Sequence, residues 1–192
     1  MTDRLAYLWP EIALFLTTCV VMVLGLSRAP GTRRLCALVS IAGVIVAGAA
    51  AHITTPRADA GGGLDPGAGQ VLLPDLVAYA KVLIAVVGVL LLLVLGGTVD
   101  RSEEAQIARG ERRFDPLRTN RAEFYAFVLF SLTGLMLCAS ADDLIWLFLA
   151  LELTSLPTYI MVVMSTWRSR SQEAGVKYFF LGAMGAAVFL FG

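Results

Sequence analysis

The sequence is poor in the residues that carry most metal and redox chemistry. It has one histidine, His52, and three cysteines among 192 residues. A single histidine does not supply the two ligands of a bis-histidine haem. The cysteines lie in apolar runs without the paired spacing of a disulfide framework or a metal site; they are Cys19, Cys36 and Cys138. We therefore expect the cysteines to be small core residues and this chain to carry no cofactor.

Charged residues are also scarce. They make up 16% of the chain against 58% hydrophobic residues, whereas a soluble domain has about 25% charged residues. Fifteen basic residues balance fifteen acidic ones, so the chain lacks the net positive charge of a nucleic-acid-binding protein. One core of a domain this size does not hide so much apolar surface, because a large share of the unfolded surface stays exposed. We expect lipid to surround much of the chain.

Six apolar stretches approach the length of about 20 residues that a membrane-spanning helix needs. The predicted fold is therefore all-α, a polytopic transmembrane helix bundle of about six spans. The first stretch does not read as a secretory signal, because acidic Asp3 and Glu11 stand where a basic segment is usual. The six predicted spans are Pro10 to Leu26, Leu35 to Ile53, Leu76 to Gly97, Phe124 to Ala139, Leu144 to Met164 and Ala174 to Gly192.

The arginines predict the orientation of these spans. The first, third and fifth loops carry eleven arginines, and the opposite side has only Arg4 and Arg57. Because cytoplasmic loops are enriched in basic residues, this places the N-terminus outside the cytoplasm. The mixed charges of the long loop from Thr98 to Arg121 predict a solvated cytoplasmic loop and not a phosphate or RNA site.

The only two lysines, Lys81 and Lys177, fall inside predicted spans, whereas the thirteen arginines are assigned to loops. A desolvated lysine loses its proton far more readily than an arginine, so both are candidates for a proton path. The alternative is that each side chain extends to the membrane surface, because both lie near the ends of their spans. Glu173, one turn before Lys177, would then form an ordinary surface pair with it.

Glu152 is the strongest candidate for a functional residue. It is the ninth residue of its predicted span, about 12 Å along the helix axis and close to mid-membrane. A carboxylate at that depth is costly and is a functional-site hypothesis by default. The alternative is a neutral glutamic acid that hydrogen-bonds between helices. The acidic residues at span ends, Glu123, Asp142 and Asp143, are expected to cap or terminate helices.

Pro157 follows Glu152 by five residues and cannot donate a backbone hydrogen bond. The carbonyl of Leu153 therefore loses its helical partner, and we expect a helix kink beside Glu152. Ser155 and Tyr159 fall on the same face as Glu152 and would make that stripe polar. A kink that serves only packing is the alternative.

The motifs from Arg121 onward resemble a known family. They are a helix opening with EFY, the turn ASADDL, the segment LELTSLP around Glu152, and KYFFLGA beginning at Lys177. In these motifs the chain resembles the subunit N family of the proton-pumping NADH-quinone oxidoreductase, respiratory complex I. The earlier segment LPDLVAYAKVL, which contains Lys81, is similar to the third helix of that family.

This resemblance implies an antiporter-like, proton-translocating membrane subunit that couples quinone reduction on other subunits to proton transfer. In the family, the glutamate matching Glu152 pairs with a lysine on a later broken helix, and the lysine matching Lys177 belongs to a polar chain along the membrane arm. It also implies membrane-subunit partners, and the high ratio of arginine to lysine together with the alanine-rich spans suggests a bacterial cell membrane. NADH, flavin, iron-sulfur clusters and quinone are expected on partner subunits. This chain itself is expected to carry no catalytic residue and no metal site.

The family pattern needs more helices than this chain provides. Residues 1–121 are expected to hold about three spans and a cytoplasmic loop, and residues 122–192 the first part of the antiporter-like unit, incomplete at its C-terminal end. The chain therefore lacks the broken helices and their lysines. Two alternatives stay open, namely a subunit of a multisubunit sodium/proton antiporter and a membrane scaffold in which the polar residues only join helices.

The predicted topology is testable by cysteine labelling. A thiol reagent that does not cross membranes should modify an Ala105→Cys variant only after the membrane is opened, because the loop from Thr98 to Arg121 is expected in the cytoplasm. Labelling in intact cells would overturn this orientation.

Overall fold

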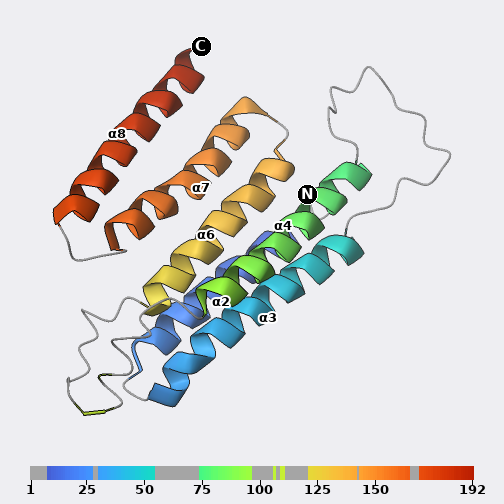
Figure 1. The fold of residues 1–192 in the computed structure, drawn as a ribbon. Coiled ribbons are helices and arrows are strands. Elements are labelled where there is room, and N and C mark those ends of the chain that lie inside the picture. The colour runs from blue at the N-terminus through green and yellow to red at the C-terminus, as the bar shows by residue number, and fades with distance from the viewer. Residues whose placement is uncertain are drawn as a thin grey trace.

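The computed structural model describes residues 8–27, 30–54, 74–96, 106, 109–110, 121–141, 143–164 and 169–192. Six long helices account for nearly all of these residues, which confirms the all-α prediction (Figure 1). They are α2 (Trp9–Gly25), α3 (Pro30–Thr54), α4 (Pro74–Leu95), α6 (Arg121–Ala139), α7 (Leu144–Met164) and α8 (Ser169–Phe191).

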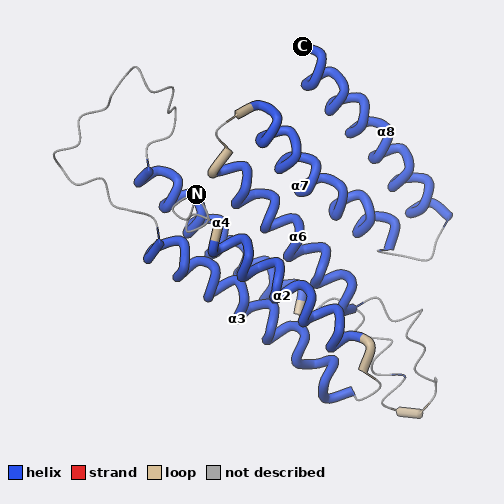
Figure 2. Tube along the Cα trace, turned by 180° about the vertical axis from the view of Figure 1, so that it is seen from behind, coloured by secondary structure: helices blue, strands red, loops and turns tan. Residues whose placement is uncertain are grey.

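Consecutive helices run in opposite directions along one common axis (Figures 1 and 2). Helices α2, α3, α4 and α6 pack together as one group, while α7 packs against α6 and α8 packs against α7 at the outer edge. The start of α2, the start of α4 and the end of α6 therefore lie at the same end of the bundle.

Five of the helices are long and apolar enough to cross a membrane; they are α3, α4, α6, α7 and α8. Helix α2 is shorter, with 17 residues or about 25 Å of length. The largest differences from the predicted spans are at α3 and α8, which begin at Pro30 and Ser169, because in each a polar first turn and a half continues the helix before the apolar run. Asp142 and most of the predicted loop from Thr98 to Arg121 lie outside the described residues.

The core lies between α2, α3, α4 and α6. Leu14, Leu92, Tyr125, Leu129 and Met136 are fully buried there, and three of these five belong to α6. Large apolar side chains such as those on the outer faces of α2, α4 and α8 are exposed. An apolar exterior around an apolar core is what a bundle surrounded by lipid requires.

The cysteines divide between these two environments. Cys36 is buried as predicted, and Cys138 is half-buried. The expectation of a core position is wrong for Cys19, which is exposed on α2. In a membrane bundle an apolar run surrounds the whole helix, so hydropathy does not distinguish the core side from the lipid side.

The buried serine and threonine hydroxyl groups are satisfied within their own helices. Thr18 donates to the carbonyl of Leu14, and Ser40 donates to that of Cys36, each over 2.8 Å. Thr133 on α6 makes the same bond to Leu129. These bonds remove the cost of burying a hydroxyl without joining one helix to another.

Gly134 allows α6 to approach the backbone of α7. A Cβ atom at this position would lie 2.6 Å from the amide nitrogen of Thr154 and 2.9 Å from the carbonyl carbon of Leu153. Since backbone atoms do not move aside as a flexible side chain would, the contact depends on the absence of a side chain. It also places α6 directly against the turn of α7 that precedes Pro157.

Substitution of Gly134 by alanine should force α6 and α7 apart. We expect a loss of about 1–3 kcal/mol of stability, as for other overpacked cores, measured as a lower unfolding temperature of the membrane protein in detergent. Gly185→Ala on α8 is the matched control, because nothing lies within 4 Å of its added methyl group. Equal unfolding temperatures for both variants would contradict the close approach.

Candidate functional site

Glu152 lies on the stripe of α7 that faces α8. Four residues before it, Phe148 stacks on Phe189 of α8 with ring centroids 6.3 Å apart. Seven residues after it, Tyr159 meets Tyr178 of α8 edge to face at 4.7 Å. Residues spaced by four and seven share one helix face, so the side chain of Glu152 projects from α7 between these two aromatic contacts.

The carboxylate of Glu152 is half-buried at the middle of its helix. It is the ninth of the 21 residues of α7, as the sequence predicted, and so lies about 12 Å from the helix start. Its side chain forms no ion pair or hydrogen bond with another residue in the described ranges. An acidic side chain at this depth requires a proton, water or a cationic group from outside these helices.

The two residues predicted to make a polar stripe beside Glu152, Ser155 and Tyr159, are engaged in other contacts. Ser155 donates to the carbonyl of Leu151, so its hydroxyl is occupied within α7. Tyr159 is buried, and it packs against Tyr178 and Phe179 of α8. Tyr159 therefore acts mainly as an aromatic contact between the two helices.

Pro157 is buried within α7, which stays helical on both sides of it. Polar side chains gather around the turn that contains it. Ser131 of α6 donates to the carbonyl of Thr154 over 3.1 Å, and Thr158 donates to that of Ser155 over 2.6 Å. These hydroxyl groups add hydrogen bonds to the two carbonyls that follow Leu153, whose own carbonyl loses its helical donor at Pro157.

Lys177 lies on the exposed surface of α8 and pairs with Glu173. The two charged atoms are 2.5 Å apart, and 74% of the lysine side chain is exposed. This is the surface pair that the sequence suggested as an alternative to a proton-path role. Its position in a longer polar chain stays a prediction.

The structure does not bring Lys177 and Glu152 into contact. The antiparallel contacts of Phe148 with Phe189 and of Val163 with Gly175 fix the register of α7 against α8. In this register Lys177 is level with a point two to three turns beyond Glu152, about 12 Å along the axis. A proton that passes between the two residues needs water or another side chain as a bridge.

Lys81 is buried, with 3% of its side chain exposed, and its ammonium lies 2.6 Å from Oε1 of Glu11. Lys81 therefore points into the bundle and pairs with a carboxylate, whereas the alternative expected it to extend outward to the membrane surface. It is the eighth residue of α4, and helical side chains lean toward the helix start. That direction brings its ammonium to the first turn of α2, where Glu11 is the third residue.

Glu11 is the charged site residue that sequence reasoning missed. In the sequence Glu11 argues only against a signal peptide, because a carboxylate in the first turn of a helix is common. The signal in the sequence that could have identified Glu11 is its depth along its span, compared with that of Lys81. Glu11 and Lys81 are opposite charges near the starts of two parallel spans, so the predicted topology already placed them at the same side of the membrane.

The remaining acidic candidates are helix-terminal residues, as expected. The carboxylate of Asp143 accepts a hydrogen bond from the amide of Trp146 over 2.6 Å and so caps the start of α7. Glu123 is exposed in the first turn of α6. The side chains of both residues are exposed, so neither is a buried charge.

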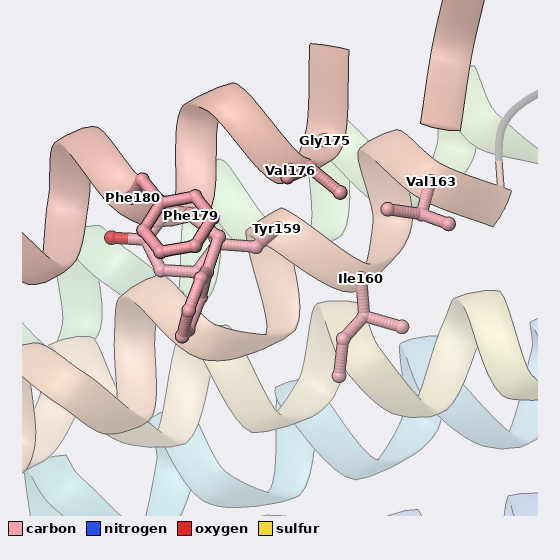
Figure 3. A pocket seen from close by; sticks show the side chains of 7 residues that line it. All are labelled: Tyr159, Ile160, Val163, Gly175, Val176, Phe179 and Phe180. Carbon is pink, nitrogen blue, oxygen red and sulfur yellow. The ribbon is translucent and has the colours of Figure 1, made fainter. Parts of the chain in front are cut away.

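A shallow apolar groove lies between the second half of α7 and the first half of α8 (Figure 3). Its lining includes Tyr159 and the close contact of Val163 with Gly175, and no charged side chain. The groove thus offers neither a proton-binding group nor a polar route between Glu152 and Lys177.

Comparison with known proteins agrees with the resemblance in the motifs. Residues 141–192, which contain Glu152, Pro157 and Lys177, match the family described as NADH:quinone oxidoreductase/Mrp antiporter, TM. No solved structure matches the chain.

Three curated relatives of the chain share one name. NADH-quinone oxidoreductase subunit N of Erythrobacter litoralis is 31% identical over the whole chain and 36% of its own length. That of Rhodospirillum rubrum is 32% identical over 95% of the chain and 34% of its own length. A third, from Ectopseudomonas mendocina, is 48% identical over 38% of the chain and 15% of its own length. The chain therefore spans about a third of the length of the first two relatives, and along its whole length it is similar to NADH-quinone oxidoreductase subunit N.

Proposed function

We propose that this chain is part of an antiporter-like, proton-translocating membrane subunit of a bacterial NADH-quinone oxidoreductase. Glu152 is the observation that carries the proposal. It is a half-buried carboxylate in the middle of a membrane-spanning helix, it has no charged partner in the described ranges, and it lies in the region matched by the antiporter family. A structural glutamate would have its hydrogen bonds satisfied by the neighbouring helices.

The proposed proton path contains Glu152, Lys177 and Lys81. Glu152 when ionised favours a protonated lysine placed near it, and separation of the two charges favours release of the lysine's proton. The aromatic contacts on either side hold Glu152 between α7 and α8. Pro157 would allow α7 to bend beside the carboxylate and admit water, since the backbone there lacks one hydrogen bond.

Energy for this transfer comes from elsewhere in the proposed complex. Within the described residues, no three His, Cys, Asp or Glu side chains cluster in a way that suits a metal. We place NADH, flavin, iron-sulfur clusters and quinone on partner subunits, and other membrane subunits beside this chain. The proposed location is the bacterial inner membrane, with the N-terminus outside the cytoplasm.

Replacement of Glu152 by glutamine tests this function. The variant keeps the side-chain shape and removes the intramembrane anion, so assembly should persist while protons moved per electron, or turnover if coupling is strict, should fall. Glu152→Asp keeps the charge and should retain more activity. Proton uptake and quinone reduction are measured together in membrane vesicles that hold the assembled complex.

Glu123→Gln is the matched control, because it makes the same chemical change on an exposed carboxylate. Its proton uptake should equal that of the unaltered protein. Full pumping by the Glu152→Gln variant would remove Glu152 from the mechanism and favour a scaffold. Exchange of sodium for protons in vesicles without any electron donor would instead favour a stand-alone antiporter.

A further inference from the structure

A second pair of buried charges lies inside the four-helix group, on helices other than those that hold Glu152. Glu11 of α2 and Lys81 of α4 are 2.6 Å apart, with side chains 5% and 3% exposed. Around them the cores of these helices consist of apolar side chains and of hydroxyls bonded within their own helices. Glu11 and Lys81 are thus the charged residues that are buried in the described part of the chain.

A gain in the stability of the fold is a poor explanation for this buried ion pair. Removing two charges from water costs several kcal/mol per ion, and their attraction repays this only with good geometry and further hydrogen bonds. Helices α2 and α4 are each packed against α3 and α6, so they do not depend on this pair to stay in the bundle. A buried pair therefore suggests a role that apolar residues do not fill.

The geometry of Glu11 leaves its carboxylate incompletely satisfied. Both of its oxygens are buried, and neither accepts a well-aligned hydrogen bond from the described residues, although Oε1 is at ion-pair distance from Lys81. An ionised carboxylate has room for about four hydrogen bonds. Glu11 is also only about 3 Å along the axis from the start of α2, so it lies close to one end of the bundle.

The cation of the buried pair is a lysine and not an arginine, which is a second observation in favour of a functional role. All thirteen arginines lie outside the predicted spans, and the buried position is occupied by one of only two lysines. Arginine pairs better with a carboxylate because it forms two parallel hydrogen bonds, but it does not give up its proton in proteins. Lysine is therefore the poorer choice for a structural pair and the better one for a site that exchanges a proton.

We propose that Glu11 and Lys81 form a second proton-exchange site, at the end of the bundle where α2 and α4 begin. The inference rests on the proposed function and adds Glu11 to the path, as the residue that controls the proton on Lys81.

The proposed step moves one proton. While the two side chains are in contact, the carboxylate holds the proton on the Lys81 ammonium. When α2 and α4 shift and the pair opens, one N–H bond of the ammonium breaks, its electron pair stays on nitrogen, and the proton passes to a water molecule. Uptake of a proton from water restores the pair.

Lys81→Arg distinguishes this site from a structural pair. Arginine keeps the charge and the contact with Glu11, so the complex should assemble, but the proton on residue 81 is no longer exchangeable. We expect protons moved per electron to fall by about twofold or more in vesicles, while the amount of assembled complex is unchanged. Pumping equal to that of the unaltered protein would overturn the proposal.

The double variant Glu11→Gln/Lys81→Met provides a second test if the larger arginine does not fit. It removes both charges together, so no unpaired ion is left in the core, and assembly should persist. Loss of pumping in the assembled complex supports the site, whereas full pumping overturns it. Failure of both variants to assemble also overturns it, because the pair would then be needed for the fold.

Two further variants separate this inference from the proposed function. Ser40→Ala changes a buried polar residue of the same bundle that carries no charge, and it should pump normally. Glu152→Gln is measured in the same vesicles. Loss of pumping in Glu152→Gln with full pumping in Lys81→Arg removes only the second site, and normal pumping in Glu152→Gln removes the proposed function irrespective of Lys81.

Discussion

The hydrocarbon core of a membrane offers no hydrogen-bond partners, and this constraint accounts for how most polar groups of the protein are arranged. Backbone groups are paired within helices, and the hydroxyl groups of Thr18, Ser40 and Thr133 bond to carbonyls one turn earlier. With lipid on the outside, the helices gain little from burying apolar surface against one another. Their contacts depend instead on close fit, which Gly134 provides where α6 meets the backbone of α7.

Helix α6 links the two parts of the molecule that carry buried charge. One side of it packs on α2 and α4, which hold the pair of Glu11 and Lys81, and another side packs on α7, which holds Glu152. A movement of α6 would therefore change its contacts with the helices that hold the Glu11–Lys81 pair and with the helix that holds Glu152. The division of the chain at residue 121 stays a prediction, but the helices before and after that point share one core.

Hydropathy and charge predicted the helices and the depth of Glu152, because both depend on position along one segment. The pairing of Lys81 depends on which way a helix is turned. An apolar helix gives no such signal in its sequence, and the same reason explains the wrong placement of Cys19. Lys177 was found by its residue type, whereas its exposure follows from the position of α8 at the edge of the bundle, which a single sequence does not show.

The pair of Glu11 and Lys81 also has a consequence for how the chain enters the membrane. Its members are 70 residues apart in the sequence, the difference between 81 and 11. During synthesis α2 is therefore complete well before the lysine of α4 has left the ribosome. Until then Glu11 has to stay at the aqueous edge of the insertion channel or enter lipid as a neutral acid. Helix α2 therefore buries Glu11 as an ion only once α4 supplies Lys81, so the burial of this charge is coupled to the assembly of the two helices.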